Sequence, residues 1–88
     1  MKIKNGFILR KVGDSSVVIT VGEAAKNFKG MIKLNETGAF IWSLISDNKT
    51  VDEIASAMTE EYEITKEQAK ADAEAFINKL KENNVLED

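Results

Sequence analysis

Residues 30–45 read GMIKLNETGAFIWSLI and decide how this chain folds. The first part alternates bulky apolar residues with Gly30 or Lys33, which is typical of a strand with one buried face. Asn35 follows, and its side chain can accept a hydrogen bond from the first turn of a helix. The rest of the stretch is strongly apolar. It therefore predicts a strand that runs directly into a capped helix, with sheet before it and helices after it.

Two further strands are expected upstream. Residues 7–12, FILRKV, and 17–21, VVITV, are short and rich in β-branched and aromatic side chains, which suit a pleated sheet. Residues 13–16, GDSS, are typical of a turn. With a third strand over 28–34, they predict a three-stranded antiparallel sheet that has at least one open edge.

The downstream half predicts three helices. The first helix ends near residues 46–48. Its predicted buried face consists of Phe40, Ile41, Leu44 and Ile45. Trp42 lies off that face, where it either packs over the edge of the domain or contributes to a partner surface.

The second and third helices each begin with a polar cap. Thr50 with Glu53, and Thr65 with Gln68, have the spacing of capping boxes. An apolar stripe with helical spacing follows each cap, and Asn83-Asn84 closes the last helix with a left-handed residue. Val85-Leu86 then folds back onto the core. The order of elements predicts a winged-helix-like α+β fold.

The composition bounds the chemistry. The chain has 88 residues, 43% of them hydrophobic, which is enough for a single small domain spanning 1–88. It contains no cysteine and no histidine, the residues that most often bind metals or act as nucleophile and general base. We therefore expect no catalytic residue, no metal and no cofactor. There is no signal peptide and no run of about 20 apolar residues, so a cytoplasmic protein without a membrane partner is expected.

Charge is distributed unevenly along the chain. Residues 1–34 carry seven bases and two acids, a balance of +5, whereas residues 35–88 carry five bases and thirteen acids, a balance of −8. A winged-helix order invites comparison with DNA-binding regulators, whose recognition helices are normally basic. The third helix here, over 66–82, is almost neutral and lies in the acidic half. Duplex binding is disfavoured, but it remains the alternative function.

Peptide binding fits the pattern better. An open sheet edge beside a helix with a small apolar face, at Ala69 and Ala73, offers backbone hydrogen bonds to an added strand. Lys29 and Lys33 either blunt that edge or steer an acidic peptide onto it. Asp72 lies beside the apolar stripe and is expected to be an exposed residue that pairs with Lys66, Lys70 or a lysine of the sheet.

Several stretches of this sequence together resemble a known protein family. Residues 30–39, GMIKLNETGA, the pair Ile41-Trp42, the helix opening 50–54, TVDEI, and the terminal 76–80, FINKL, resemble the PqqD family. The resemblance implies the fold of a precursor-peptide recognition element. It also implies a non-enzymatic chaperone that binds the leader of a ribosomally made precursor peptide. Such a chaperone presents the leader to a modifying enzyme, often a radical S-adenosylmethionine protein.

The resemblance also implies where the leader binds. It pairs as an extra strand with the third strand and lies toward the third helix. The implied positions are Lys29, Gly30, Met31, Ile32, Lys33, Ala69, Asp72, Ala73, Phe76 and Leu80. Phe76 and Leu80 also belong to the predicted core. The loop over residues 61–65 is longer and more acidic than expected for family members that serve pyrroloquinoline quinone synthesis. The identity of the precursor and of its modification therefore stays open. A monomer or a weak homodimer is expected.

Overall fold

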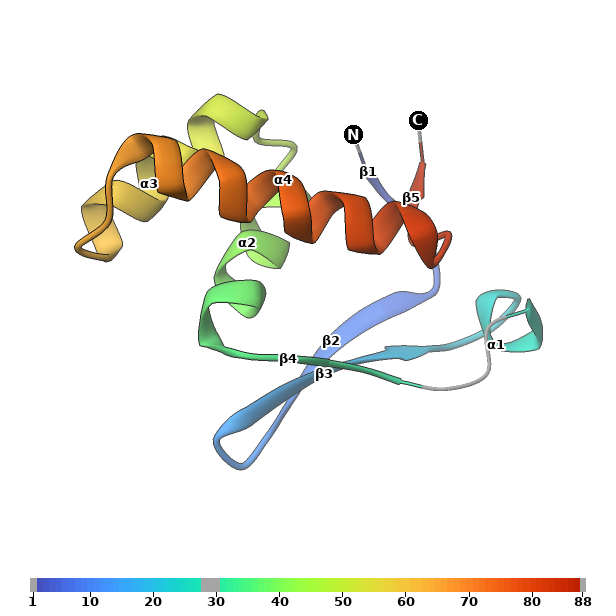
Figure 1. The fold of residues 1–88 in the computed structure, drawn as a ribbon. Helices are drawn as coiled ribbons and strands as arrows, with labels where there is room; N and C mark the ends of the chain where they lie inside the picture. Colours follow the sequence, from blue (N-terminus) through green and yellow to red (C-terminus); the bar gives the residue numbers. More distant parts are fainter. Residues whose placement is uncertain (1, 28–30, 88) are drawn as a thin grey trace.

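The computed structural model describes residues 2–27 and 31–87. Figure 1 shows a sheet below and a layer of helices above it, with the first and last residues of the described chain side by side. In chain order the elements are β1 (Lys2–Ile3), β2 (Phe7–Val12), β3 (Ser15–Thr20), α1 (Ala24–Asn27), β4 (Ile32–Leu34), α2 (Glu36–Ser46), α3 (Val51–Glu61), α4 (Lys66–Glu82) and β5 (Leu86–Glu87).

The main sheet has the order β2-β3-β4, with both pairs antiparallel. Val12 pairs with Ser15, so the turn between β2 and β3 is shorter than predicted and β3 begins two residues earlier. Gly13 opens this two-residue turn at a φ of 62°, which glycine adopts without steric cost. Of the predicted strand over 28–34, Ile32–Leu34 forms β4, and residues 28–30 lie outside the described part. The three-stranded antiparallel sheet followed by three helices is confirmed.

The helices bury one continuous core against the sheet. α2 lies between the sheet and α4, and α3 packs along α4 (Figure 1). Val18, in the middle strand, is fully buried beneath them. The buried core consists of Val18, Ile32, Leu34, Ile41, Trp42, Ile45, Ile54, Ala55, Met58, Ala69, Ala73, Ile77, Leu80, Val85 and Leu86.

Trp42 belongs to this core, which corrects both sequence-based interpretations of it. Its side chain is only 4% exposed. Once α2 begins at Glu36, its buried residues are Gly38, Ile41, Trp42 and Ile45, at the spacing i, i+3, i+4 and i+7. Phe40 is only partly buried, and its ring and that of Tyr62 form a T-shaped pair with a centroid distance of 5.6 Å. The sequence predicts a buried face of α2 that is rotated toward Phe40 and Leu44, because these two residues are as hydrophobic as the residues that are buried.

The predicted caps form at α2 and α3. Asn35 Oδ1 accepts a hydrogen bond from the Gly38 backbone N–H at 2.8 Å. Thr50 and Glu53 make both bonds of a capping box. The C-terminus of α4 closes as predicted, with Asn84 in the left-handed region at a φ of 58°.

At α4 the forward cap bond is present: Thr65 Oγ1 accepts from the Gln68 backbone N–H at 3.1 Å. The Gln68 side chain, however, donates to Asp72 Oδ1 at 2.8 Å. The expectation that Asp72 pairs with a lysine is therefore wrong. It is exposed, as expected, but its partner is one helical turn away on its own helix. Lys66 instead donates to Ser56, and Lys70 pairs with Asp52.

The capping box gives α3 a predictable response to acid. Hydrogen bonds from the Thr50 backbone and side chain lower the pKa of Glu53. A lowered folded-state pKa stabilises the protein above the unfolded-state pKa, and this contribution disappears as pH falls through the folded-state pKa. Glu53→Gln keeps an acceptor but does not titrate. We expect its free energy of unfolding to vary less between pH 6 and pH 3 than that of the wild type, measured by urea denaturation. An unchanged pH dependence would contradict this.

A second, two-stranded sheet joins the chain ends and was not predicted. Lys2 pairs with Glu87 and Ile3 with Leu86. The Lys4 backbone N–H also donates to the Val85 carbonyl at 2.8 Å, and Val85 is fully buried. The predicted return of Val85-Leu86 to the core is thus confirmed. Strands of two residues are too short to show a periodicity in sequence. No helix within 2–27 and 31–87 is both long and apolar enough to cross a membrane.

Candidate functional site

The candidate site begins with β4, which lies at one edge of the main sheet. β3 is the middle strand, so β4 pairs on one side only, with Ile32 opposite Val18 and Lys33 opposite Val17. The other side of an edge strand presents backbone N–H and C=O groups that the sheet does not use.

The ladder shows which residue of β4 presents those groups. The Val21 backbone N–H donates to the carbonyl of Gly6, its opposite residue, at 2.8 Å. That pair is therefore of the hydrogen-bonded type, and in an antiparallel sheet the types alternate along each strand. It follows that Val18 turns its backbone toward β4. Ile32 turns its own backbone toward β3, and Lys33 turns its N–H and C=O toward the free edge.

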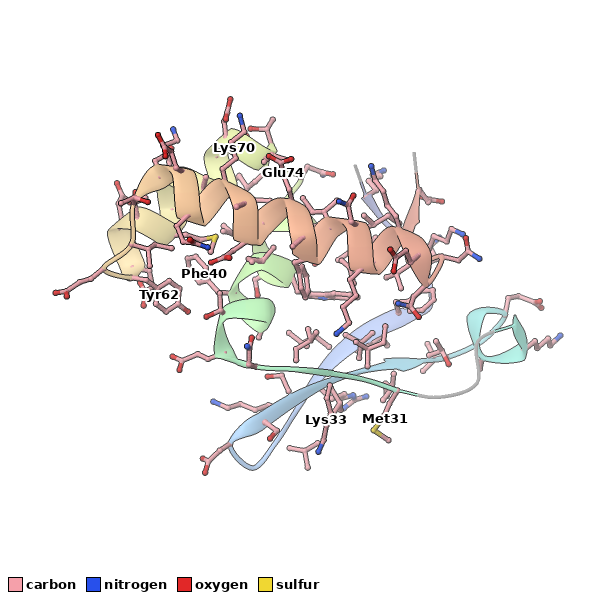
Figure 2. All side chains as sticks on the ribbon, viewed as in Figure 1. Met31, Lys33, Phe40, Tyr62, Lys70 and Glu74 are labelled. Carbon is pink, nitrogen blue, oxygen red and sulfur yellow. The ribbon has the colours of Figure 1, made fainter. Side chains whose placement is uncertain are left out.

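The side chains of β4 and of the residue before it separate by face. Ile32 and Leu34 are buried beneath the helices, whereas Met31 is 63% exposed and Lys33 is also exposed. Figure 2 shows Met31 and Lys33 projecting from the sheet away from α2 and α4. Lys70 and Glu74 project from the opposite side of α4, distant from this edge (Figure 2). The predicted alternation of buried and accessible residues in this strand is confirmed.

Phe76 links α4 to the junction of β4 and α2. An added β-carbon on Gly38 would lie 3.2 Å from Phe76 Cε1, 3.2 Å from Asn35 Oδ1 and 3.4 Å from Leu34 Cβ. The aromatic ring therefore rests directly on the first turn of α2. Phe76 is only partly buried, so part of its ring stays accessible. Glycine at position 38 is what allows this close approach.

Gly38→Ala tests that contact. Alanine is the better helix former by up to about 1 kcal/mol. It also crowds the Asn35 cap and the Phe76 ring, and loss of a cap costs about 1 kcal/mol by itself. We expect the crowding of the cap and of the ring together to outweigh the gain in helix propensity, so the unfolding free energy should fall and the Phe76 ring resonances should shift. The double variant with Phe76→Leu should recover part of the loss. A more stable single variant with unshifted ring resonances would contradict the crowding.

The structure places the remaining implied residues as follows. Lys29 and Gly30 lie outside the described part of the chain. Ala69, Ala73 and Leu80 are fully buried in the core. They support the position of α4, while Phe76 and Asp72 are the implied α4 residues with accessible side chains. Direct contact between these residues and a peptide stays a prediction.

The outer face of the sheet carries a feature that sequence reasoning missed. The exposed large hydrophobic residues of the described chain are Ile8, Val12, Val21 and Met31, at 37%, 62%, 42% and 63% exposure. The register places all four on the face that points away from the helices. Their common phase, opposite to that of buried Val18, is the signal that could have identified them.

Among the described residues, two cations share this outer face. Arg10 and Lys33 are the cross-strand neighbours of Val17 on either side. Val17 is buried although it faces outward, and the aliphatic stems of two such neighbours are long enough to cover it. Within residues 2–27 and 31–87, neither cation lies within ion-pair distance of a carboxylate. The same residues contain no cluster of three or more acidic, histidine or cysteine side chains able to hold a metal.

Two solved structures share this fold. The chain is similar to TbiB1, solved in complex with the TbiA(beta) leader peptide, at 25% identity and a TM-score of 0.82, covering 99% of this chain and 95% of that one. It is also similar to a lasso peptide synthetase B1 complexed with the leader peptide, at 24% identity and a TM-score of 0.79, covering 96% and 93%.

A comparison with curated proteins found no significant match. The sequence does match a family model over residues 12–86, which is most of the chain. That family is described as Coenzyme PQQ synthesis protein D (PqqD), and the protein belongs to it.

Proposed function

We propose that this protein binds the leader segment of a ribosomally synthesised precursor peptide by adding it as a strand to β4. The observation that carries the proposal is the edge position of β4, with the Lys33 backbone turned outward. An extended peptide alongside it gains main-chain hydrogen bonds, and pockets for alternate side chains add selectivity. TbiB1, 25% identical over nearly the whole chain, was solved with a leader peptide, which supports the same class of ligand here.

The accessible part of Phe76 supplies an apolar contact next to that edge. The ring rests on Gly38 in the first turn of α2, which follows β4 directly. A leader strand beside β4 would present every second side chain to this helical side of the sheet. Because a disordered leader must be ordered on binding, part of the contact energy is offset, and micromolar to nanomolar affinity is expected.

The protein then acts as a non-catalytic chaperone that presents the leader to a modifying enzyme, such as a radical S-adenosylmethionine protein. The absence of histidine and cysteine from the sequence supports a role in binding over one in chemistry. Since the precursor is made by ribosomes, the proposed place of action is the cytoplasm. The pairing of a small binding protein with a separate enzyme would keep recognition of the leader apart from modification of the core peptide.

An amide chemical-shift titration tests this function. The probe is a synthetic leader from the precursor encoded nearest to this protein's gene, added to labelled full-length protein. Shifts are expected at residues 31–34 and along α4 around Phe76. Shifts spread evenly over the surface, or confined to α3, would contradict binding at the β4 edge.

The same titration with duplex DNA checks the alternative function. Phosphate contacts make duplex binding fall steeply with salt, whereas backbone hydrogen bonds to a peptide strand depend less on it. No comparison supports DNA binding. Strong, salt-sensitive shifts with DNA and none with the leader would replace the proposed function.

A further inference from the structure

The direction of the Lys33 backbone fixes the type of pair that an added strand forms there: the residue opposite Lys33 exchanges backbone hydrogen bonds with it. This inference rests on the proposed function. An antiparallel strand, the pairing used throughout this sheet, would place one of its residues opposite Lys33 as a hydrogen-bonded pair. Opposite residues in a sheet share a face. The peptide residue at that position, here called p, therefore has its side chain on the outer face beside the Lys33 ammonium group.

The charge of the outer face favours an acid at p. The row that p would extend already contains Arg10, Val17 and Lys33, in that order across the sheet. Neither cation has an ion-pair partner within the described part of the chain. A carboxylate at p would be the direct cross-strand neighbour of Lys33, and opposite charges in such pairs attract while like charges repel.

The neighbouring row favours an apolar residue two positions later. In an antiparallel strand, p+2 lies opposite Met31. Continuing the register of β4 by one residue places Met31 beside Ile19, whose partner in β2 is Ile8. This row is apolar, and Met31 at its end is 63% exposed. An apolar side chain at p+2 would cover that thioether.

The residue between them points to the other side of the sheet. Position p+1 lies opposite Ile32, whose side chain is buried beneath the helices. Its side chain would therefore enter the apolar layer on the helical side, which buried Ile32 and Leu34 form at this strand. A charged group there would lose water against these apolar side chains, so an apolar residue is favoured.

We propose that the strand recognised at β4 carries Asp or Glu opposite Lys33, followed at the next two positions by apolar residues. The Lys33 side chain thus selects by charge which peptide residue lies opposite it, while its backbone supplies the hydrogen bonds to that residue. The alternative role of this lysine, protection of an open edge from aggregation, requires no preference for the sequence of a partner strand.

Selection from a display library of random twelve-residue peptides tests the motif. The full-length protein is the bait, as wild type and as Lys33→Glu. Lys11→Glu, an exposed lysine on the opposite edge strand, is the control with the same net charge. We expect the wild-type and Lys11→Glu pools to be enriched in an acidic residue followed by two apolar residues. The Lys33→Glu pool should be enriched in Lys or Arg at that first position.

Binding of individual peptides then gives the size of the effect. Lys33→Glu is expected to weaken the best acidic peptide about 3–10-fold at low salt, and a peptide with Lys at p should recover that loss. An amide spectrum checks that each variant is folded, and Lys33→Gln replaces Lys33→Glu if it is not. For Lys33→Gln the expected result is loss of the acidic preference.

The outcomes distinguish failure of the proposed peptide motif from failure of the proposed leader-binding function. The motif would be overturned, while strand addition stands, if the wild-type and Lys33→Glu pools are enriched in peptides without a preference for an acid. The same holds if an acidic preference is present and Lys33→Glu leaves it unchanged. An acid enriched after the apolar pair, in place of before it, would overturn the antiparallel register. If no peptide is enriched on any bait, both the proposed function and the motif fail.

Discussion

Lys33→Pro is expected to weaken leader binding by about 5–100-fold while leaving the protein folded. Proline is tolerated on an edge strand where the backbone N–H faces away from the sheet, which is the case for Lys33. The substitution removes the donor that an added strand would use and leaves a peptide carbonyl without a partner. Such an unsatisfied group costs about 1–3 kcal/mol, and 1.4 kcal/mol corresponds to a factor of ten in affinity.

Lys33→Ala is the matched control, because it removes the ammonium group and keeps the backbone donor. Calorimetric titration of each variant with the same leader gives both affinities. The difference between alanine and proline then isolates the backbone contribution. Equal affinities for the two variants, both with native amide spectra, would mean that the Lys33 N–H does not pair with the ligand.

Ile32→Pro should behave differently although it lies one residue away. The Ile32 backbone faces β3, and its side chain is buried in the core. Proline there removes a bond from the ladder and an apolar side chain from the core, so a loss of about 3 kcal/mol or more in unfolding free energy is expected. In a domain of this size such a loss approaches the total stability. Chemical denaturation of both proline variants measures the contrast, and a Lys33→Pro variant less stable than Ile32→Pro would mean that the backbone directions are reversed.

Leu80→Ala is expected to destabilise the protein by about 2–5 kcal/mol. Leu80 is fully buried among the side chains of the core, and truncation of such a residue leaves a cavity that the surroundings fill only in part. The measurement is urea denaturation followed by circular dichroism. Among the folded molecules that remain, leader affinity should be close to that of the wild type, because Leu80 has no accessible surface.

Phe76→Ala is compared with Leu80→Ala, because the two variants should differ in their effects on stability and on leader affinity. Phe76 is only partly buried, so its truncation should cost less stability than a fully buried aromatic residue would. It also removes the accessible ring that rests on the first turn of α2 and that we propose contacts the leader, so the larger effect is expected on leader affinity. If Leu80→Ala weakened binding more than Phe76→Ala at conditions where both are folded, Leu80 would be the contact and the position proposed for Phe76 would be wrong.

Local chemistry made much of the fold predictable. Asn35, Thr50 and Thr65 cap the three long helices at the predicted places, because each cap depends on a side chain and a backbone N–H three residues later. The sheet strands were predictable from β-branched residues between turn residues. The alternation in 31–34 correctly separated Ile32 and Leu34, which are buried, from Lys33, which is exposed.

Other features needed the folded chain. Trp42 is buried because α2 presents Gly38, Ile41 and Ile45 to the same side, and sequence cannot rank those residues above equally apolar Phe40. The sequence predicts a lysine partner for Asp72, but Asp72 accepts a hydrogen bond from Gln68. Lys66 and Lys70 are turned toward α3, where they pair with Ser56 and Asp52. The pairing of β1 with β5 joins residues at opposite ends of the sequence, and neither strand is long enough to show a pattern.

By itself the sequence determined the order of strands and helices, the helix caps and the family resemblance, since these depend on residues close together in the chain. Only the tertiary structure decided that Lys33 and not Ile32 turns its backbone to the free edge, and that the cations of β2 and β4 flank Val17 in one row of the outer face. These properties depend on which strands pair and in which register. Pairing is a relation between distant segments, and burial of the whole apolar face selects it.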